Sequence, residues 1–530
     1  MSLFGLIAAF LAYGLFLYRR LPRFLHFFQQ DEYDNNRFLR WVGDARTVDT
    51  RATFPLAAIA ALSFAGAQWN ASWVWPLACA VAMASVAIME PDPRMVGKKP
   101  LVMTQRATMI FRVSLALGLG VGVLLALYAP IWGWLIGVQM PPLLLAAANL
   151  LLSPLERRTQ LFFLNDAKRR LREINPAIIG VTGSFGKTSV KHTLGHILSL
   201  ADNAYITPGS VNTTMGISRV IRENLPADCR NFVVEMGAYG PGSIARLCDL
   251  TPPSVGIITA LGEAHYERFK TLDTVARAKF ELAESVLQKP GGLMIIHDSV
   301  LDQAYARAFV AKHRDKFVVC GERDGADVFV KTWTASAKGL DMTLTWRGGE
   351  FRIEAPLFGA HNIGNIAVAF GAAVSVGVSP ERVVAALRTA PQTKHRLEVK
   401  HQSNGAIVID DAYNSNPKGF EAALEVLTIL GQGKRRRILV TPGMVELGEL
   451  HDQLHGKLGE SAARNADLVI AVRPERIPTF VAAVEQGPCA PLKFGSFAEA
   501  KAWLDQNLRG DDVVLLENDL PDLYERKLAI

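Results

Sequence analysis

The chain has 530 residues, which is too long for a single hydrophobic core and predicts three or four folding units. Half of its residues are hydrophobic and its mean hydropathy is positive, and both values are high for a purely soluble enzyme. The net charge of +7 is modest, and the Lys and Arg side chains cluster beside apolar segments without interleaved aromatic residues. This pattern argues against a nucleic-acid-binding protein. The five cysteines are scattered and form no C-x-x-C pair, which excludes a disulfide framework and a cysteine zinc site and indicates reduced thiols.

The excess of apolar residues is concentrated in the first 152 residues. Five apolar segments lie at about 3–18, 53–68, 71–89, 107–128 and 131–152. The loops 19–52 and 90–106 carry many Lys and Arg residues, whereas the short connections between segments carry no charge. The positive-inside rule therefore predicts a multi-pass membrane region of about five helices, with the N-terminus outside and the remainder of the chain in the cytoplasm. No small-residue cleavage site follows the first segment, so we interpret it as an anchor and not as a signal peptide.

Two polar stretches accompany these segments. Residues 153–175 are rich in Arg and Lys and predict a basic amphipathic linker at the membrane surface. Residues 29–41, "QQDEYDNNRFLRW", could contact the catalytic domains or a lipid headgroup. The interpretation that we favour is an interfacial helix with Phe38 and Trp41 as its anchors.

The stretch "AIIGVTGSFGKTSV" predicts a buried strand, a Gly-rich turn and a helix, which is the setting of a phosphate-binding loop. In that setting Lys187 reaches the β- and γ-phosphates and the Thr188 hydroxyl can hold Mg²⁺. Val181 occupies the first Gly position of the strict motif, so the loop by itself is a modest signal. The predicted phosphate-binding loop consists of Gly183, Ser184, Phe185, Gly186, Lys187, Thr188 and Ser189.

Two later strands support this site. In "NFVVEMG" (231–237) Glu235 stands at the carboxyl end of a predicted strand, and "VGIITALGEAH" (255–265) begins with another predicted strand and ends with His265. Each residue also has an ordinary interpretation, Glu235 as a helix cap and His265 as a solvated loop histidine. Ligands of α/β sheets gather beyond the carboxyl ends of parallel strands, so we expect both side chains to lie near the loop, where the Glu235 carboxylate can hold a metal.

From about residue 176 to 530 the sequence resembles the Mur ligases, the ATP-dependent amide-forming family of peptidoglycan synthesis. It is most similar to the branch that adds D-alanyl-D-alanine. The motifs that carry the resemblance are "TGSFGKTS", "VVEMGA", "ITALGEAH", "ARAKFEL", "HNIGNIAVA", "HRLEV", "DDAYNSNP" and "MVELGE". The resemblance implies an α/β fold with a central P-loop ATPase domain over 176–394 and a C-terminal Rossmann-like domain over 395–530. These would follow the α-helical transmembrane region 1–152 and the linker 153–175.

Site residues are implied by the same motifs. Lys187, Lys279, His265 and Arg396 would be catalytic, with ATP and Mg²⁺ as cofactors. Thr188, Glu235, His265 and a carbamylated Lys279 would hold the metal. Asn362, Asn365, Arg396 and Asp411 would bind the nucleotide, and Tyr413, Asn414 and Asn416 lie in the matching "YNxNP" turn. Lys279 as a bare cation would repel Mg²⁺, whereas a carbamate supplies oxygen ligands.

The chemistry expected from the resemblance is activation of a carboxylate as an acyl phosphate, followed by attack of an amine. The expected partners are a UDP-linked or lipid-linked cell-wall precursor and an amino acid or dipeptide, with D-Ala-D-Ala favoured, and no nucleic acid. One alternative is a membrane-anchored ligase that makes a capsule-type poly-amino acid or modifies a lipid-linked precursor. An ATP-driven transporter would need a strict Walker loop and a signature helix, which the sequence lacks. Another alternative is a binding module that has lost catalytic activity. The presence of Lys187, Glu235, His265 and Lys279 together argues against it.

Three stretches depart from the family pattern. Gly443 stands in "PGMVELG" where Asp is common, "LLENDLPDLY" replaces the usual ending, and "HDS" at 297–299 replaces an Asn-containing turn. The first two lie where the C-terminal domain would meet the amine substrate and the nucleotide. Residues 327–357 alternate polar and apolar side chains and predict inserted antiparallel strands.

Overall fold

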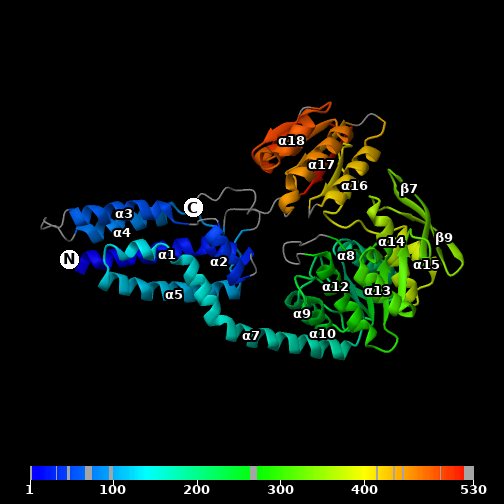
Figure 1. The fold of residues 1–530 in the computed structure, drawn as a ribbon, viewed down its shortest axis with the longest axis horizontal. Helices are drawn as coiled ribbons and strands as arrows, with labels where there is room; N and C mark the ends of the chain where they lie inside the picture. Colours follow the sequence, from blue (N-terminus) through cyan, green and yellow to red (C-terminus); the bar gives the residue numbers. More distant parts are fainter. Residues whose placement is uncertain are drawn as a thin grey trace. The chain divides into compact units, whose positions relative to one another are not determined.

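The computed structural model describes residues 3–30, 33–44, 48–65, 74–94, 100–262, 271–412, 416–433, 436–444, 447–489 and 491–518. The chain divides into an N-terminal unit up to Thr159 and a second unit over Gln160–Asp519. The N-terminal unit is helical (Figure 1). Its helices are α1 (Leu3–Gln30), α2 (Asn35–Asp44), α3 (Thr50–Ala65), α4 (Val74–Met89), α5 (Gln105–Tyr128), α6 (Gly133–Gly137) and α7 (Pro141–Ile174), the last of which continues into the second unit.

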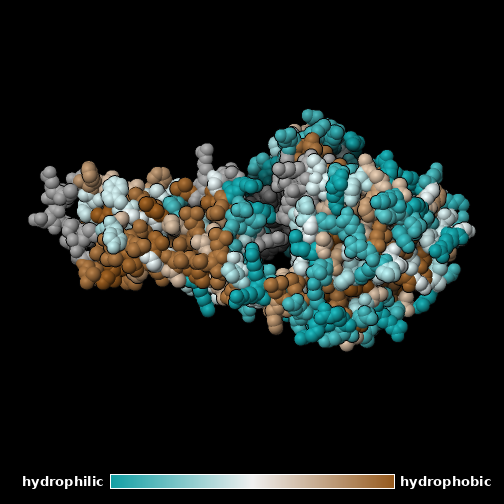
Figure 2. All heavy atoms as spheres, turned by 60° about the horizontal axis from the view of Figure 1, so that its bottom comes forward, coloured by the Kyte–Doolittle hydropathy of each residue, from teal (hydrophilic) through white to brown (hydrophobic). Residues whose placement is uncertain are grey.

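The five predicted apolar segments differ in what they form. Among the described residues, α1 and α5 are long and apolar enough to cross a membrane, while α3 and α4 are apolar but shorter. The fifth segment is divided, because α6 ends before Pro141 begins α7. The basic stretch 153–175 does not form a separate helix, since α7 runs through it to Ile174. Figure 2 shows apolar side chains covering much of the visible outer surface of these helices.

Phe38 is not an outward-facing anchor, contrary to the interfacial prediction. Its side chain is fully buried, and its ring centroid lies 4.6 Å from that of Phe28. Trp41 packs in the same way, 4.9 Å from Phe27. Both rings therefore hold α2 against α1, because aromatic burial within the unit outweighs placement at an interface.

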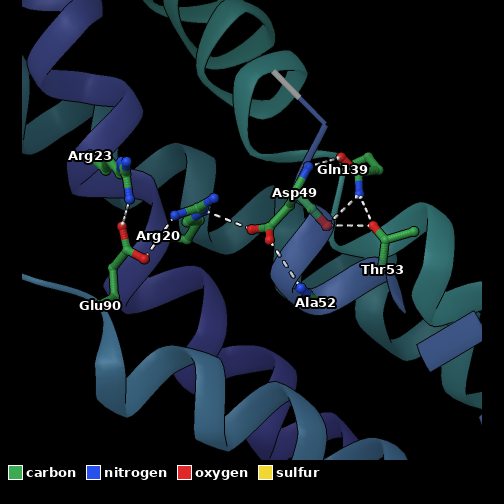
Figure 3. A network of polar contacts seen from close by, with 7 residues as sticks. All are labelled: Arg20, Arg23, Asp49, Ala52, Thr53, Glu90 and Gln139. Carbon is green, nitrogen blue, oxygen red and sulfur yellow. Dashed lines mark hydrogen bonds and ion pairs between the residues drawn. The ribbon is translucent and has the colours of Figure 1, made fainter. Parts of the chain in front are cut away.

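A buried network of charges joins α1, α3 and the end of α4 (Figure 3). Arg20 pairs with Glu90 at 2.7 Å and with Asp49 at 2.8 Å, and Arg23 pairs with Glu90 at 2.8 Å. Asp49 also receives a backbone bond from Ala52 and donates its own N–H to Gln139. Because Arg20, Asp49 and Glu90 are almost wholly buried, each charge needs the others, and the network holds these helices in one arrangement.

The second unit begins with a nine-stranded sheet in the order β2-β3-β1-β4-β5-β6-β7-β8-β9. β1–β6 are parallel, and β7, β8 and β9 form the predicted antiparallel insertion. The strands are β1 (Ala177–Thr182), β2 (Ala204–Ile206), β3 (Asn231–Glu235), β4 (Val255–Ile258), β5 (Leu293–His297), β6 (Phe317–Gly321), β7 (Val328–Ser336), β8 (Gly339–Trp346) and β9 (Gly349–Ala355).

Helices cover both faces of this sheet, as its continuous apolar strands require. One apolar core includes side chains of α9 (Thr214–Glu223), α10 (Ser243–Leu250), α12 (Leu272–Leu287) and α13 (Ala304–Lys312). The other includes side chains of α8 (Lys187–Ala201), α14 (His361–Ser375) and α15 (Pro380–Leu387). The α/β fold expected for the middle domain is confirmed.

A second sheet has the order β10-β11-β15-β12-β13-β14, in which only β10 runs antiparallel. Its strands are β10 (Glu398–His401), β11 (Ile407–Asp411), β12 (Arg436–Thr441), β13 (Leu468–Val472), β14 (Leu492–Phe494) and β15 (Asp512–Glu517). The helices α16 (Pro417–Leu430), α17 (His451–Asn465), α18 (Pro478–Glu485) and α19 (Phe497–Asn507) pack around it. This is the Rossmann-like alternation that the sequence predicts.

Candidate active site

The Gly-rich turn lies between β1 and α8, in the centre of the first sheet. Gly183 and Gly186 have φ values of +153° and +80°, which favour glycine. A Cβ on Gly183 would lie 2.0 Å from Thr259 Oγ1, and one on Gly186 would lie 2.5 Å from Asn365 Oδ1. The turn thus has no room for side chains at these two positions. Its backbone leads into the N-terminus of α8, where unpaired N–H groups favour an anion such as phosphate.

Lys187 lies over this turn. Its Nζ donates to the carbonyls of Gly183 at 2.8 Å and Ser184 at 3.2 Å. Burial lowers the pKa of Lys187 to about 8, with the nearby Arg396 guanidinium acting in the same direction and Glu235 opposing both. The cation is therefore held within the phosphate loop itself, where it can reach a bound polyphosphate.

Glu235, at the carboxyl end of β3, is the centre of a buried polar cluster. Its carboxylate accepts hydrogen bonds from Thr188 Oγ1 at 3.0 Å, Lys191 Nζ at 3.1 Å and Asn212 Nδ2 at 3.1 Å. Thr188 and Glu235 thus bring together a hydroxyl and a carboxylate, which are oxygen ligands that suit Mg²⁺. The predicted convergence of β1 and β3 is present, because these strands are parallel neighbours in the sheet.

Lys191 was missed by the sequence reasoning. It is fully buried, pairs with Glu235 and also donates to the Gly209 carbonyl. The sequence does contain a signal for Lys191, which is its spacing from Lys187. The two residues lie one helical turn apart and therefore share a face of α8.

Lys279 on α12 reaches the same loop from another side. Its Nζ donates to the Gly183 carbonyl at 2.9 Å, and the residue is 5% exposed. Burial and the neighbouring Lys187 charge hold the pKa of Lys279 well below its usual value. A lowered pKa increases the neutral amine fraction, and the neutral amine is the form that reacts with CO₂.

The two asparagines of the "HNIGN" motif line the opposite side of the turn. Asn362 Nδ2 donates to the Phe358 carbonyl at 2.6 Å, and Asn365 Nδ2 donates to Asn362 Oδ1 at 3.0 Å. The "HDS" turn also reaches α14, because a Cβ on Gly364 would lie 2.3 Å from His297 Nε2. This departure from the family pattern therefore places an imidazole against the asparagine helix.

Arg396 lines a hollow together with residues of α8 and α14. The lining residues are Ser189, Thr193, Leu357, Phe358, Asn362, Gln392, Thr393, Arg396 and Leu397. Asp411, at the end of β11, accepts a bond from the Leu397 backbone N–H at 3.1 Å. Burial raises the pKa of Asp411 to about 6, although that bond and the Arg396 charge oppose the rise. Arg396 and Asp411 thus lie beside one segment, because Asp411 bonds to Leu397, the residue after Arg396, and Arg396 shares the hollow with residues of α8 and α14.

The remaining predicted residues divide into two groups. His265, Tyr413 and Asn414 lie outside the described residues. Asn416 caps α16, since its side chain accepts a bond from the Gly419 N–H at 3.0 Å, which is a structural role. Phe185 is partly exposed at the tip of the loop, and Ser184 Oγ bonds with the backbone of Gly262.

Gly443, where the family commonly has Asp, has a structural reason to be glycine. Its φ is +75°, and a Cβ there would lie 2.4 Å from Ile477 Cγ2 and 2.6 Å from His455 Nε2. His455 is buried and accepts a bond from the Met444 N–H at 3.0 Å. An imidazole therefore fills the space beside this turn.

Comparison with known proteins agrees with this geometry. The family profile for the Mur ligase middle domain matches residues 181–373, and that for the Mur ligase glutamate ligase domain matches residues 395–517. A UDP-N-acetylmuramoyl-tripeptide–D-alanyl-D-alanine ligase of Mycobacterium leprae is 32% identical over 313 residues, covering 54% of this chain and 59% of the relative. The enzyme of that name from Bacillus subtilis is 30% identical over 294 residues, covering 55% and 62%. The chain thus spans less than two thirds of the length of these relatives.

Solved structures give the same result for the fold. MurF from Acinetobacter baumannii superposes with a TM-score of 0.57 at 28% identity, covering 68% of this chain and 77% of that one. MurF from Thermotoga maritima, in complex with ADP, superposes with a TM-score of 0.58 at 24% identity, covering 68% and 80%. The two adjoining domain matches include the phosphate loop, Glu235, Lys279 and the "HNIGN" helix. By its middle and C-terminal domains, the chain belongs to the Mur ligase family.

Proposed function

We propose that the protein is an ATP-dependent ligase that forms an amide bond between a cell-wall precursor carboxylate and the amino group of D-alanyl-D-alanine. The observation that carries this proposal is the single site in which the glycine turn, Lys187 and the Thr188–Glu235 pair meet. The substrates are suggested by the relatives, which are named as ligases of UDP-N-acetylmuramoyl-tripeptide and D-alanyl-D-alanine.

The reaction has two steps. The carboxylate first attacks the γ-phosphorus of ATP, which gives an acyl phosphate and ADP. The amine then attacks the acyl carbon, phosphate leaves and the amine proton is lost. Phosphoryl transfer needs alignment and charge neutralisation more than covalent help, and Lys187 at the loop and Arg396 at the hollow would supply positive charge.

Mg²⁺ is the metal that the oxygen donors of this site suit. Thr188 and Glu235 would hold it, and a carbamate on Lys279 would add further oxygen ligands. His265 would complete this set. When bound, the ion neutralises phosphate charge; Asn362, Asn365 and Asp411 would bind or orient the nucleotide.

We also propose that the N-terminal unit is embedded in the cytoplasmic membrane, with the ligase domains in the cytoplasm. Nearly all the exposed large apolar side chains of the described residues lie in or next to this unit, the exceptions being Phe185, Leu200, Trp333 and Leu450. Their surface forms the apolar covering seen in Figure 2. The test is extraction of membranes: alkaline carbonate should leave the chain in the pellet and detergent should release it, whereas release by carbonate would refute the embedding.

A second candidate differs only in the acyl substrate, which would be lipid-linked instead of soluble. The apolar surface of the N-terminal unit favours it, because a substrate in the bilayer would be concentrated beside the enzyme. A ligase that makes a capsule-type poly-amino acid shares the chemistry but would use an amino acid as the amine.

The experiment uses the full chain in detergent with ATP, Mg²⁺, UDP-muramyl tripeptide and D-alanyl-D-alanine. We expect a ligated product by mass spectrometry and ADP release that requires both substrates. Lys187→Ala should abolish both, while Arg277→Ala, a change on the exposed face of α12, should leave both unchanged. ADP release that depends on L-glutamate and not on the dipeptide would favour the poly-amino acid reaction. Turnover only with a lipid-linked tripeptide would favour the second candidate.

A further inference from the structure

A hollow opens on the N-terminal unit where α1, the segment after α4 and the start of α5 meet. Its lining residues are Tyr18, Arg19, Pro22, Asp92, Pro93, Arg94, Met103 and Phe111. The hollow thus has both arginine side chains and apolar or aromatic ones. It is far in sequence from every residue assigned to the ligase site.

Arg19 provides an incompletely neutralised positive charge in this hollow. Its Nε donates to the Ala87 carbonyl at 3.2 Å and its Nη2 to the Glu90 carbonyl at 2.6 Å. These bonds cap the C-terminus of α4, which accounts for two of its nitrogens. Within the described part of the chain, no ion pair joins Arg19 to a carboxylate, and Asp92, the acidic residue that its charge acts on, is bound by Arg94. The third guanidinium nitrogen of Arg19 can therefore bind an acidic ligand.

The neighbouring carboxylates are already paired with other arginines. Glu90 is bound by Arg20 and Arg23 in the buried network of Figure 3. Asp92 is bound by Arg94, whose Nη2 lies 2.6 Å from Asp92 Oδ2. The local charge is therefore positive, and a phosphate entering the hollow would meet Arg19 without a free carboxylate opposing it.

The other wall of the hollow continues into an apolar surface. Tyr18 packs edge-on against Phe111, with ring centroids 5.8 Å apart. Tyr18 is also the last of a row of exposed side chains on one face of α1, which begins with Leu3 and includes Ile7, Leu11 and Leu15. The row recurs at helical spacing and ends where the arginines begin. Charge and apolar surface therefore meet at one point.

We propose that this hollow binds the phosphate group of an anionic membrane phospholipid, whose acyl chains lie along the exposed face of α1. Arg19 and Arg94 contact the phosphate, and Tyr18, Met103 and Phe111 contact the glycerol and the upper acyl chain. An arginine binds phosphate through charge-assisted hydrogen bonds, and basic pockets between helices at a membrane surface recognise anionic headgroups in this way. The proposal rests on the membrane embedding proposed above and is independent of the ligase reaction.

The test is native mass spectrometry of the full chain in detergent, with phosphatidylglycerol or phosphatidylcholine of identical acyl chains added. We expect one phosphatidylglycerol to bind in preference to phosphatidylcholine. Arg94→Gln should weaken that binding by about fivefold, the effect of one arginine near an anionic headgroup, and Arg19→Gln by at least as much. Arg51→Gln, a surface arginine on the neighbouring α3, is the matched control and should change nothing.

Several results would overturn the proposal. Equal binding of the two lipids would show that headgroup charge is not recognised. Displacement of the lipid by the same concentration of inorganic phosphate would indicate an anion site without a lipid component. An equal effect of Arg51→Gln and Arg94→Gln would indicate general surface charge. Arg94→Gln keeps the test valid if Arg19→Gln fails to fold, because the Arg94–Asp92 pair is exposed. If alkaline carbonate extracts the chain, the proposal that the N-terminal unit is embedded in the membrane is wrong. If the chain stays in the membrane but shows no lipid preference, only the proposal of a lipid site in the hollow is wrong.

Discussion

Replacing Lys191 by methionine should loosen the core of the middle domain. Lys191 and Glu235 form a buried ion pair at 3.1 Å, with the two side chains 0% and 1% exposed. Removing one partner of such a pair leaves an uncompensated charge and costs about 3–5 kcal/mol. Glu235 would keep its bonds from Thr188 and Asn212, so we expect the lower end, about 3 kcal/mol. Methionine keeps the length of the lysine stem, which limits any added cavity cost.

Hydrogen exchange of the full chain, followed by mass spectrometry, measures this loss locally. Peptides from β1, β3 and α8 should exchange about 100-fold faster in Lys191→Met than in the unmodified chain, since about 1.4 kcal/mol corresponds to tenfold. The control is Arg277→Met, which removes an exposed pair with Asp273 and should cost under about 1 kcal/mol. If the two variants exchange alike, the buried pair does not stabilise the site and the reasoning is refuted.

Three further changes test other parts of the account. Lys279→Ala should abolish turnover while α12 keeps its native protection against hydrogen exchange. Partial recovery of turnover with added short carboxylates would support a carbamate on Lys279. Undiminished turnover would show that Lys279 is not part of the site. Gly443→Ala should destabilise the C-terminal domain by about 1–3 kcal/mol in thermal unfolding, because φ is +75° and His455 blocks a Cβ, and an unchanged midpoint would contradict this. Burial raises the pKa of Asp411 in the folded chain to about 6, above its usual value of about 4. The folded state therefore loses stability as the pH rises from about 4 to 6, because the buried carboxyl must ionise. Asp411→Asn should therefore raise the unfolding midpoint at pH 8 and have little effect near pH 4; the opposite pH trend would contradict the assignment.

The sequence predicted which residues of the candidate site lie together best where their positions follow directly from strand order. The glycine turn, Glu235 and the "HNIGN" helix each follow a recognisable pattern, and a parallel sheet brings the carboxyl ends of its strands together. Asn416 was part of a recognised turn, yet its local bond to Gly419 gives it a capping role. A motif therefore located the segment correctly without deciding what each side chain does.

Contacts between distant segments could not be predicted in the same way. The pairing of Lys191 with Glu235, and the approach of His297 to Gly364, depend on how separate elements pack. In the N-terminal unit, the sequence predicts that Arg20 belongs to a basic loop between apolar segments, but the residue is buried within α1. Phe38 was assigned to an interface because an amphipathic helix can bury its aromatic residues against lipid or against protein, and the pattern is the same in both cases.

In the proposed reaction, ATP bound at the Lys187 loop activates a carboxylate as an acyl phosphate. Its most direct test is oxygen transfer. UDP-muramyl tripeptide with ¹⁸O in the reacting carboxylate is incubated with the full chain, ATP and D-alanyl-D-alanine, and the released phosphate is analysed by mass spectrometry. If the carboxylate attacks the γ-phosphorus, one ¹⁸O from the carboxylate appears in phosphate for each amide formed. Ligated product accompanied by unlabelled phosphate would contradict the acyl-phosphate mechanism, because the bridging oxygen would then have come from elsewhere.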